Sequence, residues 1–513
     1  MVPLRSTSGS ECGDVQWHPE EFERARLARD PHFDGRVFIG VLTTGIYCRP
    51  VCPARIPRRE NIRLYASAAA AAEAGFRPCL RCRPESAPGT PAWLGTSHTV
   101  ARALQLLAQG VLDEGGMPAL ARAVGVGERQ LARLFQTHLG VSVVTVAKTQ
   151  RLQLAKKLLD ETDLPMASVC FAAGFSSIRR FNAVFAEIYG HTPLSLRRTR
   201  PESCAATAPP THLTLRLHYR PPFDWAAMLD YLQRRAIPGV EWVTRDSYAR
   251  SLMLEGDVAF LQVQFLHDTH QVLVRLYGSQ IRSLAQVLER VRVMFDLKAV
   301  SADVDAHLAQ DPRLQPLVAA YPGTRVPVAW DGFEVAVRAI LGQQVSVKAA
   351  TTLVARLAAA YGRPCVAPAA LPLTHVFPEP AALAEATLDG LGITARRIAA
   401  IQSLARAVQA GELRFDGSMA TAAFVTRIQQ IPGIGPWTAQ YIALRALNDA
   451  DAFPHADLIL LRAAALPGET LDPAALLALA ERWRPWRAYA VLLLWRHHAD
   501  GATAARIPTV TGD

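Results

Sequence analysis

The sequence has little lysine and no long hydrophobic run. Of its 55 basic residues, 5 are lysine and 50 are arginine. No apolar stretch approaches the roughly 18 residues of a membrane-spanning helix. The opening residues MVPLRSTSGSECGDVQW also lack the apolar core of a secretion signal. These absences predict a cytoplasmic protein with no membrane partner.

The size and charge of the chain limit the number of its domains and the kind of partner it can bind. At 513 residues it is too long for a single hydrophobic core, so we expect roughly three or four domains. Half of the residues are hydrophobic and 19% are charged, which is typical of folded proteins and excludes a disordered one. The net charge of +10 favours a polyanionic partner, nucleic acid ahead of a membrane surface. Because the excess is almost all arginine, a codon-biased genome is an alternative explanation of the charge.

Composition and periodicity predict the domain order. A stretch rich in Pro, Gly and Ser, 84–97, and a second stretch that contains three prolines, 201–211, are typical of linkers. The segment between them has helical periodicity, and helical periodicity returns from about residue 300 to 500. Alternating residues after the second linker predict strands at 213–219, 258–265 and 271–277, with a helix around 225–235. The predicted domains are 10–86, 98–200, 211–299 and 300–500.

Four of the eight cysteines form two close pairs. Three residues separate Cys48 from Cys52, two separate Cys79 from Cys82, and 26 lie between the pairs. In a reducing compartment this spacing indicates a thiolate metal site, and zinc is the divalent ion that thiolates select. By spacing alone, a purely structural zinc site is the favoured interpretation, since most four-cysteine sites are structural.

The residues around the cysteines change that interpretation. The words TTGIYCRPVC, RREN and AGFRPCLRC, within residues 29–85, resemble the amino-terminal domain of the Ada family of alkylation-response proteins. The resemblance implies one zinc ion held by all four cysteines. It also implies that Cys48 irreversibly accepts a methyl group from a methylphosphotriester in DNA. The neighbouring arginines are then candidates for phosphate contacts: Arg49, Arg55, Arg58 and Arg59.

The segment between the linkers contains two similar helical pairs, 120–140 and 166–193. Each has a glycine turn before its second helix, and in the second pair we expect Ser176 to cap that helix. Inward-facing positions are predicted at Leu131, Leu134, Phe135, Phe181 and Phe185, with Cys170 in the core. Outward-facing positions are predicted at Arg129, Arg133, Ser177, Arg179 and Arg180. One such helix would be an ordinary solvated face. Two in tandem, with the phrase AAGFSSIRRFNAVFAEIYGHTP, resemble the AraC-type DNA-binding domain, whose outward side chains would read bases.

A glycine turn near the end of the chain opens another helix. In QIPGIGPWTAQYIALRAL, Gly433 and Gly435 can let a phosphate approach backbone N–H groups at a helix start, as in a helix-hairpin-helix. Trp437 and Tyr441 are four residues apart and share one helix face. Asp457 follows in FPHADL, ahead of an apolar run. Without further context, Asp457 reads as a helix cap and the two aromatic residues as core.

Longer stretches give the second half a family resemblance. The phrases FEVAVRAILGQQVSVKAATTLVARL, IPGIGPWTAQYIALRAL, FPHADL and RWRPWRAYAVLLLW resemble the AlkA-type 3-methyladenine DNA glycosylases of the helix-hairpin-helix superfamily. The segment 211–299 fits the α+β domain that precedes the helices in that family. The resemblance therefore covers nearly three hundred residues.

This second resemblance assigns roles to single residues. It implies that Asp457 is catalytic and that Trp437, Tyr441 and Trp495 bind a base flipped out of the duplex. Gln344 occupies the position of the wedge that fills the duplex. Related lyases carry a Schiff-base lysine where this chain has Trp437, so a monofunctional glycosylase is implied.

The sequence thus predicts a multidomain fold class: a small zinc-bound α/β domain, an all-α double helix-turn-helix domain, an α+β domain, and an all-α helix-hairpin-helix glycosylase domain. The predicted function is an alkylation-damage response that combines methyl sensing, transcriptional activation and excision of alkylated bases. Two alternatives stand: a regulator whose carboxy-terminal half is an inactive DNA clamp, and a repair enzyme anchored by its helix-turn-helix units. We expect a monomer whose partner is double-stranded DNA, with RNA polymerase as a candidate partner.

Overall fold

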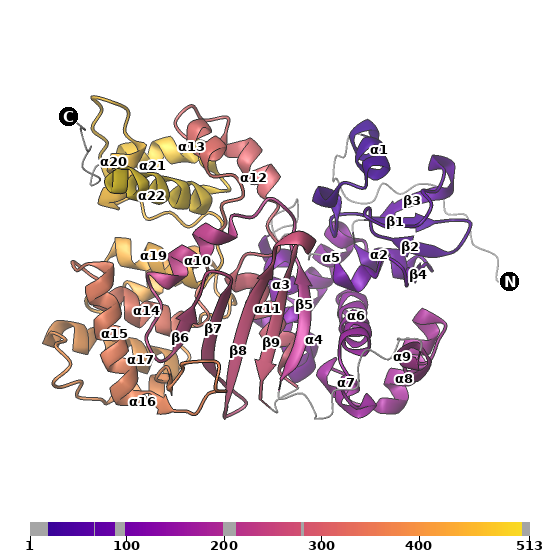
Figure 1. Ribbon diagram of the computed structural model, residues 1–513, viewed down its shortest axis with the longest axis horizontal. Helices are drawn as coiled ribbons and strands as arrows, with labels where there is room; N and C mark the ends of the chain where they lie inside the picture. The colour runs from indigo at the N-terminus through magenta and orange to yellow at the C-terminus, as the bar shows by residue number, and fades with distance from the viewer. Residues whose placement is uncertain (1–18, 66, 88–97, 199–211, 279–281, 505–513) are drawn as a thin grey trace, which may run out of the picture. The chain divides into compact units, whose positions relative to one another are not determined.

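The computed structural model describes residues 19–65, 67–87, 98–198, 212–278 and 282–504 (Figure 1). The chain divides into two compact units: unit 1 comprises residues 1–205 and 281–286, and unit 2 comprises residues 206–280 and 287–513. The predicted linker 201–211 and residues 10–18 of the first predicted domain lie outside the described residues. Within the described ranges, no helix is long and apolar enough to cross a membrane.

Unit 1 begins with a small sheet flanked by short helices. The strand order is β3-β1-β2-β4, in which β1 runs antiparallel to β2 and β3, while β4 runs parallel to β2. A Cβ at Gly40 of β1 would lie 2.8 Å from the ring of Tyr65, so glycine there lets the ring cover the sheet. The elements are α1 (Pro19–Ala28), η1 (Pro31–Phe33), β1 (Phe38–Val41), β2 (Ile46–Cys48), η2 (Arg59–Asn61), β3 (Ile62–Tyr65), α2 (Ala68–Glu73), β4 (Arg77–Pro78) and η3 (Pro84–Ser86).

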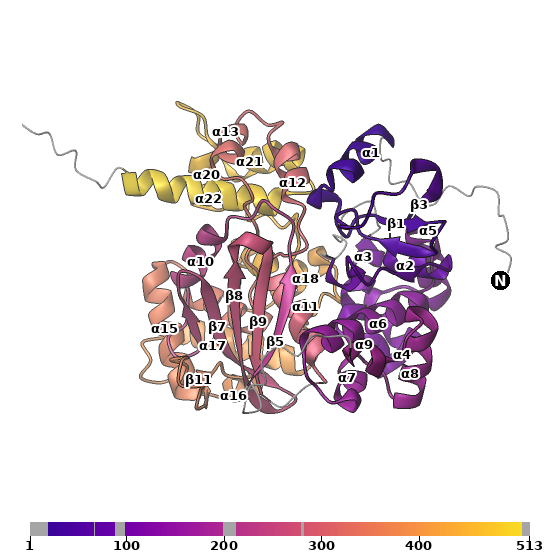
Figure 2. The same ribbon diagram turned by 45° about the vertical axis from the view of Figure 1, so that its right-hand side comes forward.

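The rest of unit 1 is helical, as its periodicity predicts. Leu131 and Phe135 of α5 and Phe181 and Phe185 of α8 are fully buried. The long helix α6 joins the two helix-turn-helix pairs (Figure 2). The helices are α3 (His98–Ala108), α4 (Val111–Val124), α5 (Glu128–Leu139), α6 (Val143–Glu161), α7 (Met166–Ala172), α8 (Ile178–Tyr189) and α9 (Pro193–Arg198).

Two details of this region differ from the predictions. The hydroxyl of Ser177, and not that of Ser176, caps α8 by accepting a hydrogen bond from the backbone N–H of Arg180. The predicted linker 84–97 also begins with structure, because Pro84–Ser86 form η3, which contacts α6. Residues 88–97 lie outside the described part of the chain.

Unit 2 begins with a five-stranded antiparallel sheet of order β5-β9-β8-β7-β6. The predicted strands and helix are present, but periodicity missed β6 and β7. Six successive residues of β7, from Ser247 to Leu252, are buried. A strand buried on both faces does not alternate, so the pattern used to find strands was absent. The elements are β5 (Leu213–His218), α10 (Trp225–Gln233), β6 (Glu241–Val243), β7 (Ser247–Leu254), β8 (Asp257–Leu266), η4 (His267–Thr269), β9 (Gln271–Tyr277) and α11 (Leu284–Met294).

The remainder of unit 2 is a helical array around α14, which is buried along most of its length. Helices α15, α17 and α19 pack against α14. A two-stranded hairpin, β10 with β11, interrupts the helices that the sequence predicts. The helices are α12 (Ser301–Leu308), α13 (Gln315–Ala320), α14 (Gly332–Leu341), α15 (Val347–Tyr361), α16 (Pro380–Ala384), α17 (Ala395–Gln409), α18 (Thr421–Ile428), α19 (Pro436–Ala446), α20 (Leu458–Ala464), α21 (Pro473–Leu479), η5 (Ala480–Trp483) and α22 (Arg487–Ala504), and the hairpin strands are β10 (Arg363–Pro364) and β11 (His375–Val376).

Candidate functional sites

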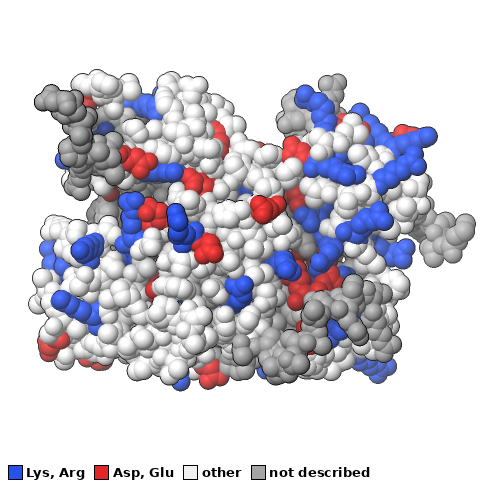
Figure 3. Space-filling view, in the orientation of Figure 1, with Lys and Arg blue, Asp and Glu red and all other residues white. Residues whose placement is uncertain are grey.

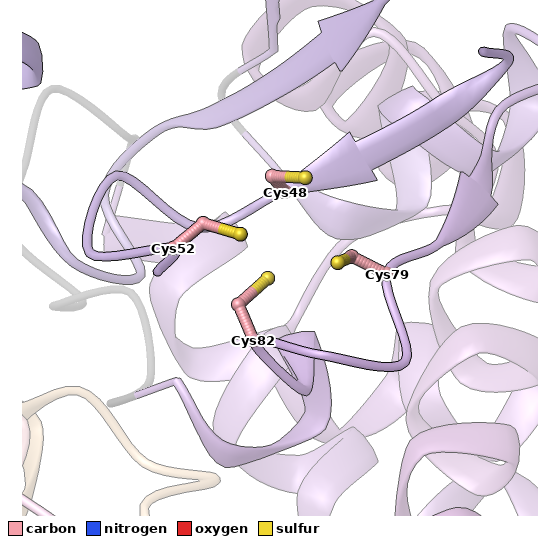
Figure 4. A group of neighbouring side chains, drawn as sticks. All are labelled: Cys48, Cys52, Cys79 and Cys82. Atoms are coloured by element: carbon pink, nitrogen blue, oxygen red, sulfur yellow. The ribbon is translucent and has the colours of Figure 1, made fainter. Parts of the chain in front are cut away.

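The four clustered cysteines meet at one end of the small sheet of unit 1. Cys48 ends β2, and Cys79 directly follows β4. Because β2 and β4 pair in parallel, with Tyr47 opposite Pro78, their carboxyl ends bring the two cysteine pairs together. The four sulfurs lie within 4.8 Å of one another and point toward a common centre (Figure 4). Four thiolates at about 2.3 Å from one zinc ion would be about 3.8 Å apart, so this donor set fits a tetrahedral metal site.

Burial distinguishes the four sulfurs. Cys79 and Cys82 are buried, whereas Cys48 and Cys52 are half-buried. The amide of Arg49 donates to Cys82 Sγ at 3.3 Å. Cys48, at the end of β2, is therefore one of the two cysteines of the cluster that solvent can reach.

Arg49 has a structural role that the sequence did not predict. Its side chain is 8% exposed. The guanidinium donates from Nε to Asp34 Oδ1 at 2.8 Å and from Nη1 to the carbonyl oxygen of Cys82 at 3.1 Å, and its Nη2 contacts Asp34 Oδ2. The buried carboxylate of Asp34 pairs with the guanidinium, so Arg49 has a structural role, and its contact with DNA phosphate stays a prediction.

Several other arginines of the four-cysteine region, residues 19–87, are exposed. On the face drawn in Figure 3, Lys and Arg side chains gather over the part that contains α1 and the small sheet. They outnumber acidic side chains there, so the surface suits a polyanion. The exposed arginines of this region include Arg55, Arg58, Arg59, Arg63, Arg77 and Arg81.

The four-cysteine region also packs on helix α6. Ala69 and Ala70 of α2 belong to the same apolar cluster as residues of α3 to α6. Glu85, three residues after Cys82, lies 3.7 Å from Lys156 Nζ, and both side chains are nearly inaccessible. Burial raises the pKa of Glu85, while the charge of Lys156 opposes that shift. Arg83 Nη2 adds an ion pair with Asp160 at 2.8 Å, without hydrogen-bond geometry.

The outward positions of the two helix-turn-helix pairs are as the periodicity predicts. Arg129 and Arg133 lie on the exposed face of α5, and Arg179 and Arg180 lie on the first turn of α8. Arg133 donates to Gln130 Oε1 at 2.7 Å. Each second helix therefore presents basic side chains to solvent.

In unit 2, the Asp457 carboxylate is 7% exposed and accepts four hydrogen bonds. Its Oδ1 caps α20 by accepting from the amides of Ile459 at 2.9 Å and Leu460 at 3.0 Å. The same oxygen accepts from Trp495 Nε1 at 3.2 Å, and Oδ2 accepts from Trp437 Nε1 at 2.7 Å. The capping interpretation of the sequence is thus correct, and Asp457 is also joined to two of the predicted aromatic residues.

The three predicted aromatic residues form one group beside Asp457. Tyr441 stacks on Trp437 with ring centroids 5.4 Å apart and planes 12° apart, as the four-residue spacing predicts. The Trp495 ring, from α22, is 6.2 Å from that of Tyr441. All three are half-buried, which differs from the core interpretation of Trp437 and Tyr441 that their local sequence alone favours. Their role in base binding stays a prediction.

Gln344 lies in the exposed loop between α14 and α15. Its φ of 57° is left-handed, which is uncommon for a side chain other than Gly, Asn or Asp. The preceding residue, Gln343, was missed by sequence reasoning. Gln343 Nε2 donates to the carbonyl oxygen of Gly433 at 2.8 Å and to Thr438 Oγ1 at 3.1 Å. The loop that carries Gln344 is therefore tied to the glycine turn before α19.

The glycine turn has the geometry of a backbone anion site. Gly433 has a φ of 94°, and Gly435 is the N-cap of α19 in extended backbone. A Cβ added at Gly435 would meet nothing within 4 Å. The amides at the start of α19 therefore lack side-chain cover from Gly435 and can meet an anion.

Two residues deeper in unit 2 were also missed. Arg445 of α19 reaches both Tyr441 and Tyr231 of α10. Tyr231 and Arg445 are 214 positions apart, so no local sequence signal could connect them.

Four family models match the chain in order. They are the metal binding domain of Ada (residues 21–85), a helix-turn-helix domain (120–199), the AlkA N-terminal domain (214–331) and the HhH-GPD superfamily base excision DNA repair protein (337–487).

Individual proteins show the same similarity. A Mycobacterium tuberculosis protein named "Probable bifunctional transcriptional activator/DNA repair enzyme AlkA" is 41% identical over 480 residues, covering 93% of this chain and 96% of that protein. The Escherichia coli protein "DNA-3-methyladenine glycosylase 2" is 37% identical over 285 residues, 54% of this chain and 95% of that protein. Among solved structures, the 3-methyladenine DNA glycosylase from Archaeoglobus fulgidus matches 55% of this chain and 98% of its own, with a TM-score of 0.50 and 20% identity. This last likeness is one of fold.

Proposed function

The chain belongs to the family of AlkA-type bifunctional transcriptional activator/DNA repair enzymes, and we propose that it acts on alkylated DNA at two separate sites. Unit 2 excises alkylated bases of the 3-methyladenine type. In unit 1, Cys48 accepts a methyl group and thereby promotes transcriptional activation through the helix-turn-helix pairs. The membership of the family supports both activities, and the geometry of each site supports its residue assignments.

The hydrogen bonds from Trp437 and Trp495 to Asp457 carry the glycosylase proposal. An ordinary helix cap needs the two backbone donors alone. Here two indole N–H groups also hold the carboxylate beside an aromatic group. A carboxylate fixed in this way can stabilise the positive charge that develops on the sugar as the base departs.

The excision step balances without a cofactor. A base alkylated on a ring nitrogen is positively charged, and the faces of Trp437, Tyr441 and Trp495 attract cations. The bond between C1′ and the base nitrogen breaks, and its electron pair leaves with the base, which becomes neutral. Water then adds to C1′ and gives up a proton, for which Asp457 is the acceptor. Trp437 has no amine for a Schiff base, so the product is an abasic site.

DNA contacts are assigned to exposed groups. The backbone amides of Gly435 and Trp437 bind a backbone phosphate, while Pro436 between them has no N–H. Gln344 enters the duplex where the base has left it. In unit 1, Arg129, Arg133, Arg179 and Arg180 contact DNA from the two second helices, with Ser177 at the start of α8. Double-stranded DNA is the partner of both units.

The half-buried position of Cys48 in the four-cysteine cluster carries the proposal that it accepts the methyl group. Cys79 and Cys82 are buried, and the Cys82 sulfur also accepts a hydrogen bond from the Arg49 amide. Cys48 ends β2 and can be reached from solvent, so a DNA phosphotriester can approach its sulfur. We assign these four cysteines as the ligands of one zinc ion, which would keep the sulfurs deprotonated at neutral pH.

The methyl transfer is a single displacement. Cys48 Sγ attacks the methyl carbon of a neutral methylphosphotriester, the carbon–oxygen bond breaks, and the phosphodiester leaves with the electron pair. The product is a thioether, so each protein molecule reacts once. The four-cysteine site loses one negative charge, and because phosphate attraction dominates DNA affinity, binding of unit 1 to DNA tightens.

One experiment tests both activities in the full chain. DNA treated with a methylating agent is incubated with wild type, Cys48→Ser, Asp457→Asn and the control Cys365→Ser. We expect mass spectrometry to find a methyl group on Cys48, and chromatography to find free methylated bases. Cys48→Ser should lose the first result alone, Asp457→Asn the second alone, and Cys365→Ser neither. A methyl group on another cysteine would refute the role of Cys48. Normal base release by Asp457→Asn would refute the catalytic role of Asp457, and no base release by wild type would favour the inactive clamp.

A further inference from the structure

The hydroxyl of Tyr441 lies within a cluster of buried polar groups. Arg445 Nη1 donates to the Tyr441 oxygen at 3.3 Å and also to the oxygen of Tyr231. Arg445 Nη1 thus bridges the two phenol oxygens. Tyr441 therefore links the aromatic group beside Asp457 to residues of the α+β part of unit 2.

Arg445 is fixed in this position. Its side chain is 5% exposed, and its Nε donates to the carbonyl oxygen of Pro327 at 2.6 Å. Its guanidinium carbon lies 4.8 Å from the Tyr231 ring centroid and 6.0 Å from that of Tyr441. The charge of Arg445 is thus directed at two phenol groups.

Further cations surround the same phenols. The guanidinium of Arg235, just after α10, lies 3.8 Å from the Tyr231 ring centroid. Arg338 of α14 contributes a third positive charge near Tyr441. Glu241 of β6 is the acidic group that opposes these charges at Arg445 and Arg338. Three arginines therefore lower the pKa of Tyr441, and Glu241 and, beyond the Trp437 ring, Asp457 are negative charges on the same side of unit 2.

These charges give Tyr441 and Tyr231 different pKa values. Burial alone would raise the pKa of Tyr441, but the charges of Arg445, Arg235 and Arg338 and a hydrogen bond from Tyr231 lower it to about 8. Burial raises the pKa of Tyr231, which stays protonated and can donate that hydrogen bond. On ionisation the Tyr441 proton passes to water.

We propose that Tyr441 is a specificity-determining residue that favours positively charged bases as a phenolate, and that Tyr231 and Arg445 are the positioning residues that hold its oxygen. The inference rests on the proposed excision of alkylated bases. A phenolate has a more electron-rich ring than a phenol, so a cation above its face is held more strongly. Ionisation of Tyr441 strengthens the binding of a neutral base only slightly, because a neutral base carries no charge for the ring to attract.

The ionisation can be measured without any enzymatic activity. The ultraviolet difference absorbance of tyrosinate is followed as pH is raised, in wild type, Tyr441→Phe, Tyr231→Phe and the control Tyr277→Phe, a tyrosine of β9 outside this cluster. We expect one tyrosine of wild type to ionise near pH 8. The step should be absent in Tyr441→Phe, unchanged in Tyr277→Phe, and about one pH unit higher in Tyr231→Phe, which lacks the donor to the phenolate.

Base release then tests the specificity. Single-turnover excision of 3-methyladenine from duplex DNA is measured across the same pH range with the same proteins. The wild-type rate constant should rise roughly three- to tenfold as Tyr441 ionises, the rise should shift with Tyr231→Phe, and it should vanish with Tyr441→Phe. Thermal melting confirms that each variant is folded.

The outcomes separate this inference from the proposed function. Wild-type excision with a flat pH profile, or a wild type with no tyrosine that ionises near pH 8, overturns the role of Tyr441 and leaves the glycosylase intact. No excision by wild type at any pH overturns the proposed function itself. A pH rise that persists in Tyr441→Phe overturns the inference, because another group would then cause it.

Discussion

The indole nitrogen of Trp437 donates a 2.7 Å hydrogen bond to Oδ2 of Asp457. The other carboxylate oxygen, Oδ1, is shared by two backbone amides and by Trp495 at 3.2 Å. Among the described residues, Trp437 is therefore the one donor to Oδ2. Replacing Trp437 removes that hydrogen bond from the carboxylate and leaves the two backbone hydrogen bonds of the helix cap in place.

Trp437→Phe should slow base release and leave the fold intact. The phenyl ring can still stack on Tyr441, but the donor to Oδ2 is lost. A hydrogen bond to a charged group contributes about 1.5–3 kcal/mol, so we expect a roughly 10- to 100-fold lower single-turnover rate. Trp242→Phe, on β6, is the matched control and should react like wild type. Normal excision by Trp437→Phe would show that this hydrogen bond has no part in the reaction.

The two glycines before α19 should respond differently to alanine. Gly433 has a φ of 94°, so Gly433→Ala should lower the free energy of unfolding by about 1–2 kcal/mol. Gly435 has an allowed φ of −87° and open space around a Cβ, so Gly435→Ala should change stability by less than about 0.5 kcal/mol. We expect Gly435→Ala to weaken binding of duplex DNA severalfold, because its methyl group covers the phosphate-binding amides. Denaturation and DNA titration measure the two effects, and unchanged DNA affinity would refute the phosphate contact.

Features set by short sequence separations were predictable from the sequence. Trp437 and Tyr441 stack because four residues make one helical turn, and the cysteine spacing indicated a metal site without any knowledge of the sheet. The cap at Asp457 follows from the apolar run after it. In each case the physical cause lies within a few residues of the group it affects.

Features set by distant partners were not predictable. Arg49 is part of a basic sequence, but its surroundings depend on Asp34, which the fold brings against it. The link between Arg445 and Tyr231 crosses 214 positions. Burial on both faces removed the alternation that would have revealed β7. Charge and periodicity are properties of the local sequence. The burial of Arg49, the contact of Arg445 with Tyr231 and the burial of β7 depend instead on which distant residues the fold brings together.

Removal of zinc should separate the two activities. A chelator that strips the four-cysteine site should abolish methyl acceptance by Cys48, because the sulfurs would become protonated thiols that are poor nucleophiles. Base release should persist, since Asp457 and its donors lie in unit 2 and use no thiolate. Cys52→Ser should reproduce the effect of the chelator. Methyl acceptance by the metal-free protein would contradict the proposed site.

The contact between the four-cysteine region, residues 19–87, and α6 should contribute strongly to the stability of unit 1. Lys156→Ala removes one of the two cations that pair with the buried carboxylate of Glu85. Because Arg83 still donates to that carboxylate at 3.3 Å, the loss should lie below the roughly 3–5 kcal/mol of a fully broken buried pair. Adding Glu85→Gln should restore part of the loss. Arg58→Ala removes an exposed pair with Glu60, in which the side chains are 83% and 67% accessible, and should cost less than about 1 kcal/mol. Equal effects of Lys156→Ala and Arg58→Ala on urea unfolding would refute the coupling.

Unit 2 should lose stability as pH rises through the titration of Asp296. Tyr489 donates to Asp296 Oδ2 at 2.7 Å, yet burial, opposed by Arg325, raises the pKa of Asp296 from 3.8 to about 6. The folded state then binds a proton that the unfolded chain has released, so this contribution is complete below about pH 4 and is lost by about pH 6. With two pKa units at about 1.4 kcal/mol each, it is at most about 3 kcal/mol. Urea unfolding from pH 4 to 7 should show this fall in wild type and a smaller one in Asp296→Asn. The exposed control Asp268→Asn should follow wild type, and identical pH dependence in all three proteins would exclude Asp296 as the source.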